Sequence, residues 1–297
     1  MKILENVNLA EYTSWLIGGT ADTFCLPTTV DELRAVLSKA KEESWPVTLF
    51  SGGSNILISD KGIRGLTICL RRFSAITTNV ENNKLVIQCL AGTTKSELLK
   101  AFLKNQLAPA LFLAGLPGDV GGGVAMNAGV AEQFQPREFM DFVNWIEVMD
   151  FNGAVKKIDR ADLKVAYRHC DGWQPGIITN VQISWPMNQD KDVLTKVREA
   201  NKIRLTKQPL DMPSCGSVFR NPIGYKAAHL IDQCGLKGYR LGDAQVSLKH
   251  ANFIVNLGAA TATDTWNVMM HVQQTVMAEK KVSLTTEVVR LGDWSGV

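Results

Sequence analysis

Long apolar runs, an excess of one charge sign and an apolar N-terminus are all missing from this chain of 297 residues. No uncharged apolar stretch approaches the ~20 residues that span a bilayer, and an acidic residue, Glu5, stands where a signal peptide needs apolar side chains. The 32 lysines and arginines nearly balance the 29 aspartates and glutamates, so the charge favours neither a nucleic-acid surface nor a polybasic membrane segment. We therefore expect no nucleic-acid partner and no membrane association.

The chain carries six cysteines and four histidines, but neither set has the spacing of a functional site. No C-x-x-C pair occurs, and Cys69 and Cys89 lie in apolar runs. We interpret the cysteines as small buried side chains in a reducing cytoplasm, with disulfides as the less favoured alternative. The histidines share no metal-ligand spacing, so we predict no metal.

The composition is that of an ordinary globular protein, with 45% hydrophobic and 21% charged residues. The length fits two domains. Capping-box patterns at Thr29–Glu32 and Thr94–Glu97 predict helices that begin there. A helix predicted over Asp192–Arg204 leads out of the first part, and beyond it short strands, one near Ser217–Phe219, alternate with helices. We place a domain boundary near residues 204–208.

Two further local structures are predicted. The segments Trp145–Phe151 and Ala154–Ile158 flank Asn152-Gly153, which is the dipeptide preferred in type I′ hairpin turns. Thr263 is predicted to be the N-cap of a helix over Asp264–Glu279, because a threonine side chain can accept a hydrogen bond from the first helical amides.

Two glycine-rich segments give the first functional signal. Ser51-Gly52-Gly53-Ser54-Asn55 lies between two apolar strands, where glycines let backbone amides approach a ligand and the polar side chains add donors. This loop matches neither a P-loop nor a Rossmann fingerprint. Ala114–Gly129 has six glycines in sixteen residues, which makes it a poor helix and is costly unless backbone passes close to something. Together the loops suggest a dinucleotide held by backbone amides, and a tight turn or an interdomain packing loop remain the alternatives.

Six ordered motifs extend this signal over nearly the whole chain. They are Tyr12-Thr13-Ser14-Trp15-Leu16-Ile17-Gly18-Gly19, Ser51-Gly52-Gly53-Ser54-Asn55, Gly115-Leu116-Pro117-Gly118 through Asn127-Ala128-Gly129, Tyr167-Arg168, Gly216-Ser217-Val218-Phe219-Arg220-Asn221-Pro222 and Leu284-Thr285-Thr286-Glu287-Val288. One glycine loop alone would be a weak signal, but six motifs in this order are specific. The sequence resembles the UDP-N-acetylenolpyruvoylglucosamine reductase family.

The resemblance implies an α+β fold. An FAD-binding domain of the vanillyl-alcohol-oxidase (PCMH) type would cover residues 1–204, in two subdomains of about 1–74 and 75–204. A smaller α+β substrate-binding domain would cover residues 205–297. No extra sequence lies between Gln182 and Gln208, which resembles the shorter class of the family, without the tyrosine-bearing substrate flap.

The resemblance also implies an activity: NADPH-dependent reduction of UDP-N-acetylglucosamine-enolpyruvate to UDP-N-acetylmuramate. This reaction belongs to peptidoglycan precursor synthesis, and through it to cell-wall biogenesis, cell shape, cell division and the cell cycle. The partners would be the UDP-sugar and NADPH, and the protein a cytoplasmic monomer or weak oligomer. We expect the FAD to be non-covalent, since no histidine or cysteine lies inside either glycine loop.

Three residues carry over to catalytic roles through the resemblance: Ser217 as general acid, Arg168 of the Tyr-Arg motif, and the C-terminal Glu287. The chemistry is consistent with each. Hydride addition to the enolpyruvyl methylene develops negative charge at the carboxylate, which a cation stabilises. The adjacent carbon then needs a proton from a positioned hydroxyl. Taken singly, the three would be a surface arginine, a turn serine and a solvated acid; the ordered motifs favour the catalytic interpretation.

The binding residues follow from the same motifs. Substrate-binding residues are Tyr167, Arg220 and Asn221, and an arginine suits a diphosphate through bidentate hydrogen bonds. Lys249 and His250 are weaker substrate candidates, and His250 could equally be a core histidine. The predicted cofactor-binding residues are Gly52, Gly53, Ser54, Asn55, Leu116, Pro117, Gly118, Gly121, Gly122 and Asn127.

The sequence departs from the family pattern at three places. Val130-Ala131-Glu132 replace a common Tyr-Gly, which puts a local flavin or substrate contact in doubt. His169 and Cys170 follow Tyr167-Arg168 where a spacer and serine are common. Gly123 stands where alanine is usual, which we expect only to loosen the loop.

Two other functions stay open from the residues. A different FAD oxidoreductase of the same fold could act on an alcohol or a 2-hydroxy acid, although the motifs of Ser217 and Glu287 argue against it. A non-catalytic module could bind a nucleotide sugar or a flavin as a sensor, although a sensor has no use for a proton donor.

Overall fold

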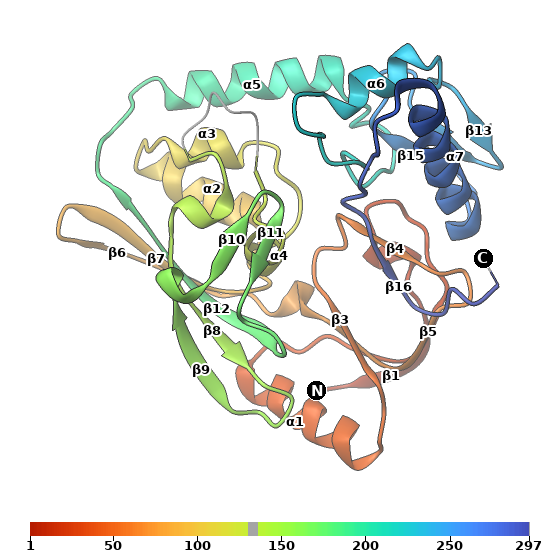
Figure 1. Ribbon diagram of the computed structural model, residues 1–297. Coiled ribbons are helices and arrows are strands. Elements are labelled where there is room, and N and C mark those ends of the chain that lie inside the picture. The colour runs from red at the N-terminus through yellow and green to blue at the C-terminus, as the bar shows by residue number, and fades with distance from the viewer. Residues whose placement is uncertain (130–135, 297) are drawn as a thin grey trace. The chain divides into compact units, whose positions relative to one another are not determined.

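The computed structural model describes residues 1–129 and 136–296 (Figure 1). The chain folds into two compact units. The first contains Cys25–Gly52 and Ile68–Lys202 together with residues 1–3, and the second contains Leu4–Phe24, Gly53–Thr67 and residues 203–296. Neither unit is a continuous stretch of sequence. The domain bounds expected from the sequence stay a prediction.

A five-stranded antiparallel sheet with the strand order β6-β7-β12-β8-β9 forms the base of the first unit. Its central strand is β12, Ile177–Pro186, whose Val181 lies opposite Cys89 of β7 and Ile146 of β8. All three side chains are buried, so this row of the sheet belongs to the core. The other strands are β6 (Ile76–Glu81), β7 (Lys84–Leu90), β8 (Val143–Met149) and β9 (Val155–Asp159).

Short helices and a small hairpin complete the first unit (Figure 1). Helix α4 packs against β7 and β12 of the sheet and against β11 of the hairpin. The elements are α1 (Val30–Glu42), β3 (Val47–Phe50), α2 (Lys95–Lys104), α3 (Pro109–Leu113), α4 (Val120–Ala125), β10 (Lys164–Ala166) and β11 (His169–Asp171), with 3-10 turns η2 (Leu70–Arg72), η3 (Phe139–Asp141) and η4 (Arg160–Asp162).

Both helix starts predicted from capping boxes are confirmed. The Thr94 hydroxyl accepts a hydrogen bond from the Glu97 amide at 3.2 Å, and the Glu97 carboxylate accepts one from the Thr94 amide at 2.8 Å. Thr29 caps α1 in the same way, but Glu32 reaches back one residue further, to the Thr28 amide. The cap is local, and the sequence pattern was therefore sufficient to find it.

The predicted hairpin is confirmed and its turn type is wrong. Strands β8 and β9 pair, but only Gly153, at φ +86°, has a positive φ, whereas a type I′ turn requires one at Asn152 as well. The Asp150 carboxylate accepts hydrogen bonds from the amides of Asn152 and Ala154, both at 2.9 Å. This side chain holds a five-residue connection, 150–154, in place of a two-residue turn.

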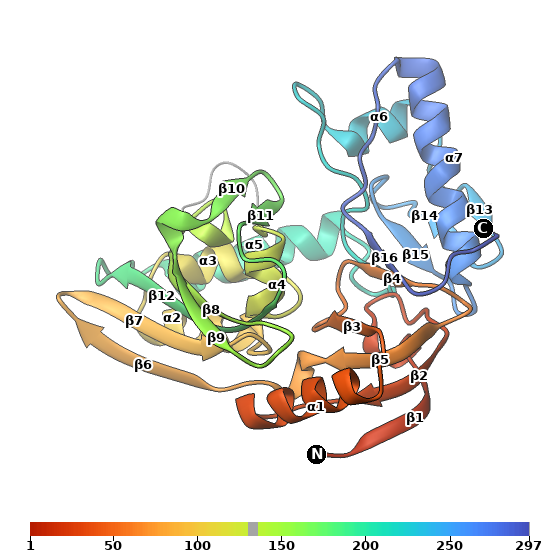
Figure 2. The same cartoon turned by 60° about the horizontal axis from the view of Figure 1, so that its bottom comes forward.

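The second unit has its own core and sheets. Helix α7, Ala262–Lys280, packs along the sheet β13-β14-β15 (Figure 2). Strand β16, Val289–Leu291, pairs in parallel with β4, Ile56–Ile58, and β1, β2 and β5 are neighbours in another sheet. Their bounds, with the remaining elements, are β1 (Ile3–Asn8), η1 (Ala10–Tyr12), β2 (Thr20–Cys25), β5 (Ile63–Cys69), α6 (Ala227–Gln233), β13 (Arg240–Leu241), β14 (Ala244–Val246) and β15 (Ile254–Asn256).

Helix α5, Val193–Lys207, confirms the helix predicted over Asp192–Arg204, with its start one residue later and its end three residues later, and its residues belong to both units. It carries basic residues in its last turn.

Within residues 1–129 and 136–296, no helix combines the length and the apolar character that crossing a membrane requires.

The N-cap predicted for α7 is wrong by two residues. Thr261, not Thr263, accepts the hydrogen bond from the Asp264 amide, at 3.0 Å. Thr263 is already helical, and its amide and hydroxyl both donate to the carboxylate of Asp60. A residue 203 positions away in the chain therefore satisfies the helix N-terminus, and sequence spacing alone could not reveal it.

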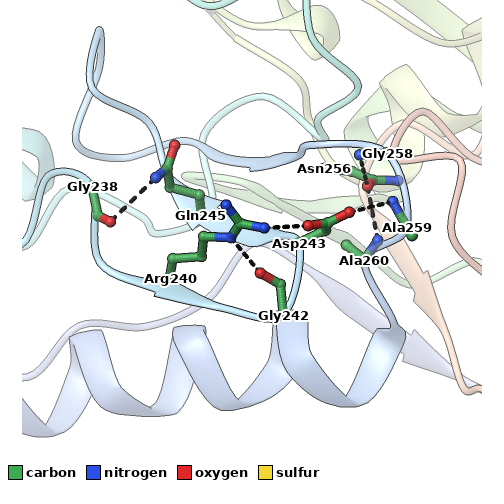
Figure 3. Close-up of polar contacts among 9 residues, drawn as sticks. All are labelled: Gly238, Arg240, Gly242, Asp243, Gln245, Asn256, Gly258, Ala259 and Ala260. Carbon is green, nitrogen blue, oxygen red and sulfur yellow. Dashed lines mark hydrogen bonds and ion pairs between the residues drawn. The ribbon is translucent and has the colours of Figure 1, made fainter.

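Asn256 joins the N-terminal and C-terminal segments of the second unit. Its side-chain amide donates to the carbonyl of Trp15 at 2.9 Å. Its side-chain oxygen accepts from the amides of Gly258 and Ala260 at 2.8 and 3.0 Å, as Figure 3 shows. The Trp15 indole in turn donates to the carbonyl of Ile254 at 2.7 Å. Trp15 is 0% exposed and Asn256 4% exposed, so these polar groups have little access to water.

We expect Asn256→Ala to lower the free energy of unfolding by about 2–4 kcal/mol, because it leaves a buried carbonyl and two amides without their partner. Urea unfolding measures the difference. Gln245→Ala is the control: this half-buried side chain makes one long bond, 3.3 Å, to the Gly238 carbonyl (Figure 3), and its loss should change stability by less than ~1 kcal/mol. Equal stability of Asn256→Ala and the wild type would show that these hydrogen bonds do not stabilise the joining of the two segments.

Candidate cofactor and active site

The two glycine-rich loops meet in the first unit. A Cβ atom on Gly52 would lie 2.8 Å from the Cα of Gly118 and 3.3 Å from the Asp119 amide nitrogen. The Ser51 hydroxyl also donates to the Asp119 carboxylate at 2.5 Å. No residue with a side chain fits at position 52, so glycine there lets two backbone segments touch.

A cavity of about 310 Å³ opens beside this contact. The Arg71 guanidinium, at its edge, donates to the Gly52 carbonyl at 3.1 Å. The cavity is lined by Gly52, Arg71, Thr94, Ser96, Leu116, Pro117, Gly118 and Asp119. Four predicted cofactor residues are therefore brought together. Nothing in the sequence marks Arg71, Ser96 and Asp119 as binding residues, and its pattern marks Thr94 only as a helix cap, because no local pattern identifies side chains that the fold brings together.

The rest of the first loop belongs to the second unit. Gly53 has φ +64°, and a Cβ on it would lie 2.1 Å from the Tyr12 carbonyl oxygen. The Ser14 amide donates to the Gly53 carbonyl at 3.0 Å, so the motif Tyr12–Gly19 is the support of this loop. The Asn55 side chain donates to the Glu287 carbonyl at 3.5 Å, and Ser54 and Asn55 are half-buried.

The second glycine-rich segment contains a helix, which corrects the expectation of a loop. Helix α4 spans three consecutive glycines. A Cβ on Gly121 would lie 2.8 Å from the Ala91 Cβ, and one on Gly123 would lie 2.8 Å from the Phe139 ring, whereas one on Gly122 would meet nothing within 4 Å. Close tertiary packing therefore compensates the poor helix propensity, and Gly122 alone presents bare backbone to open space.

Lys95 is a buried cation behind the loop. It is 5% exposed, and its ammonium donates to the Pro117 carbonyl at 2.8 Å. Burial lowers its pKa to about 8, against the opposing influence of Asp119. Burial likewise raises the pKa of Asp119, which Ser51 and Lys95 partly counteract. A Cβ on Gly123 would lie 3.0 Å from the Lys95 Cε, so the glycine that departs from the family pattern makes room for this lysine.

Arg168 lies in the turn between β10 and β11. Its φ is +56°, a conformation that non-glycine residues seldom adopt and that clusters at functional sites. The guanidinium donates to the Gly129 carbonyl at 2.9 Å, and its carbon lies 4.8 Å from the centre of the Tyr167 ring. A Cβ on Gly129 would lie 2.5 Å from an Arg168 nitrogen, which explains the glycine that ends this motif.

Ser217 and Glu287 lie on neighbouring segments of the second unit. The Glu287 amide donates to the Val218 carbonyl at 2.8 Å. The predicted strand at 217–219 is wrong: only Phe219 forms a β-bridge, to Thr286. Val218 and Phe219 are buried while Ser217 is exposed. The burial of these two apolar side chains therefore fixes the segment, with Ser217 at the surface near the Glu287 backbone.

The other predicted substrate residues have structural partners. The Asn221 side-chain oxygen accepts from the Ala227 amide at 3.0 Å, and the Arg220 amide donates to the Thr285 carbonyl at 2.8 Å. Lys249 donates to the Leu205 carbonyl at 2.7 Å. His250 packs edge-on against Phe253 with ring centres 4.7 Å apart, and burial lowers its pKa.

The departures from the family pattern have different outcomes. Cys170 is buried in β11 opposite Val165, and the exposed His169 lies 3.6 Å from the Asp171 carboxylate. The replacement of Tyr-Gly at positions 130–132 lies outside the described residues. All six cysteines of the chain are free, and five of them are buried.

Lys95→Met should change how stability depends on pH. The folded pKa is about 8 and the ordinary value is 10.5, so between these values the unfolded chain binds the proton more tightly and wild-type stability rises with pH. Relative to the wild type, Lys95→Met should therefore be more stable at pH 7 than at pH 10, by about 2–3 kcal/mol. Urea unfolding at both values tests this, with the exposed Lys100→Met as control. Parallel profiles of wild type and Lys95→Met would refute it.

Comparison with known proteins agrees with these arrangements. The family model "UDP-N-acetylenolpyruvoylglucosamine reductase, C-terminal domain" matches residues 208–291, and the model "FAD binding domain" matches residues 21–159. The chain is 36% identical over 294 residues to the UDP-N-acetylenolpyruvoylglucosamine reductase of Pediococcus pentosaceus, covering 99% of this chain and 95% of that one. It is 38% identical over 289 residues to that of Listeria monocytogenes, covering 97% and 94%.

A solved structure extends the agreement to the fold. The UDP-N-acetylenolpyruvylglucosamine reductase of Thermus caldophilus superposes with a TM-score of 0.79 at 31% identity, over 98% of this chain and 99% of that one. The α+β fold with an FAD-binding domain is thereby confirmed. Because full-length relatives exceed 30% identity and share both the motifs and the fold, the chain belongs to the UDP-N-acetylenolpyruvoylglucosamine reductase family.

Proposed function

We propose that this chain reduces the enolpyruvyl group of UDP-N-acetylglucosamine-enolpyruvate to UDP-N-acetylmuramate, with FAD as cofactor and NADPH as reductant. The observation that carries the proposal is that the exposed Ser217 is followed by the buried Val218 and Phe219, and that the backbone of Val218 is hydrogen-bonded to that of Glu287. A solvent-accessible serine on a segment anchored in this way suits delivery of a proton.

The residues of the two glycine-rich loops fit an FAD. The contact between Gly52 and Gly118 brings two stretches of backbone together beside the cavity, and Arg71 adds a cation that suits a diphosphate. Gly122 offers backbone that a flat ring can approach. We assign the holding of the FAD to these residues, to Leu116 and Pro117, and to Gly53, Ser54 and Asn55. No histidine or cysteine lies in either loop, which supports non-covalent binding.

The chemistry divides among three side chains. FAD, when bound, supplies the hydride that it receives from NADPH to the methylene carbon of the enolpyruvyl group. Arg168 stabilises the negative charge that then develops on the substrate carboxylate. Ser217 gives its proton to the carbon next to that carboxylate, which completes the reduction of the double bond. Glu287 orients the donors at the same place. We assign Tyr167, Arg220 and Asn221 to the substrate.

The cellular setting belongs to the same proposal. The product is a precursor of peptidoglycan, which connects the activity with cell-wall biogenesis, cell shape, cell division and the cell cycle. We assign the protein to the cytoplasm, as a monomer or weak oligomer. The free cysteines are compatible with a reducing compartment.

Gly122→Leu should weaken FAD binding at least ~10-fold without loss of stability, because its side chain enters the open space beside α4 and leucine favours a helix over glycine. Titration of flavin-stripped protein with FAD and thermal unfolding measure the two effects. Gly121→Leu is the contrast: its side chain meets Ala91, so stability should fall. A Gly122→Leu protein that binds FAD with wild-type affinity would remove this face of α4 from the cofactor site.

Ser217→Ala should slow flavin reoxidation by the enolpyruvyl substrate by ~10²-fold or more, which is ~2.7 kcal/mol of barrier. Flavin reduction by NADPH needs no proton on substrate carbon and should keep its wild-type rate. Stopped-flow absorbance follows the two half-reactions separately. Equal slowing of both would indicate general damage to the site, and unchanged reoxidation would mean that the proton comes from another group.

A further inference from the structure

One buried side chain, Asn127, ties the end of α4 to the hairpin that carries Arg168. Its amide nitrogen donates to the Glu138 carboxylate at 2.6 Å and to the Ala166 carbonyl at 3.0 Å. Its oxygen accepts from the Met140 amide at 3.2 Å. Asn127 is 0% exposed, and both of its N–H donors are used inside the protein.

The Ala166 carbonyl is a critical attachment point. Ala166 is the last residue of β10 and pairs with His169, so Tyr167 and Arg168 form the turn between the strands. The bond from Asn127 therefore fixes the base of the turn. Two residues after Asn127, the Gly129 carbonyl accepts from the Arg168 guanidinium. A single short segment thus holds both the backbone and the head group of the arginine.

The backbone of this region is in conformations that need such support. Asn127 has φ +39° and Arg168 has φ +56°. Residues other than glycine persist in this region only where the surrounding structure determines them. Glu138 supplies part of that support, because a carboxylate is a strong acceptor for the Asn127 amide.

We propose that Asn127, with Glu138 as its acceptor, is a positioning residue that holds Arg168 at the reacting carboxylate of the substrate. The inference rests on the proposed function, in which Arg168 stabilises charge in that reaction. The cofactor contact expected for Asn127 from the sequence stays a prediction; the contacts that the structure shows for its side chain are those to Glu138, Ala166 and Met140.

A double-mutant cycle tests the inference in the FAD-loaded enzyme. Flavin reoxidation by the enolpyruvyl substrate is measured anaerobically for the wild type, Asn127→Ala, Arg168→Met and the double variant. We expect Asn127→Ala to slow reoxidation at least ~10-fold and Arg168→Met to slow it more. In the Arg168→Met background, Asn127→Ala should add less than ~2-fold, because a residue that acts through Arg168 has nothing left to position.

Glu138 provides the matched pair of variants, and also serves if Asn127→Ala does not fold. Glu138→Gln keeps an oxygen acceptor and should stay within ~3-fold of the wild-type reoxidation rate, whereas Glu138→Ala should slow it as Asn127→Ala does. Flavin reduction by NADPH should change less than ~2-fold in both.

The outcomes distinguish a failure of the positioning role of Asn127 from a failure of the proposed role of Arg168. Slowing by Asn127→Ala that is equally large with and without Arg168 would overturn the positioning role and leave a purely structural one. Unchanged reoxidation in Asn127→Ala or Glu138→Ala would overturn it as well. Unchanged reoxidation in Arg168→Met would instead refute the proposed role of Arg168 itself, and the inference with it.

Discussion

The arrangement of the candidate site depends on contact between two stretches of bare backbone, at Gly52 and Gly118. At 2.8 Å from the Gly118 Cα, a Cβ on Gly52 has no room, and proteins accept the entropic penalty of glycine where such an approach is needed. The hydrogen bond from Ser51 to Asp119 connects the same loops. The cavity beside them is lined both by this contact and by residues with polar side chains, among them Arg71 and Asp119, so the close approach of the two loops gathers these groups around one space.

The packing of these loops leaves two ionisable side chains buried. Asp119 is 5% exposed in the loop, and Lys95 is equally buried behind it. Burial disfavours the charged form of each, and each favours the charged form of the other. Gly123 leaves space for the lysine. From the sequence, Gly123 was expected only to loosen the loop. In the structure it leaves room for the Lys95 side chain in the interior of the first unit.

Local features were predictable from the sequence and long-range ones were not. The caps at Thr29 and Thr94 depend on residues three positions apart, and both were found. The N-cap of α7 was predicted at the wrong residue because the hydroxyl of Thr263 donates a hydrogen bond to the carboxylate of Asp60, which is far away in the chain. Helix α4 was missed because tertiary packing, not propensity, stabilises its three glycines. The catalytic candidates came from ordered motifs, whereas Arg71 stands in no motif and reaches the cavity through the fold. Lys95 lies in a capping box that indicates only a helix start, and the fold brings its ammonium to the Pro117 carbonyl.

The central claim is that this chain delivers a hydride to one carbon of an enolpyruvyl ether and a solvent-derived proton to the next. The most direct measurement is anaerobic: the protein, loaded with FAD and reduced by NADPH in D₂O, is mixed with UDP-N-acetylglucosamine-enolpyruvate, and the product is examined by NMR. The account predicts flavin reoxidation and a lactyl ether with solvent deuterium at the carbon next to the carboxylate. A flavin that stays reduced, with the enolpyruvyl group unchanged, would contradict it.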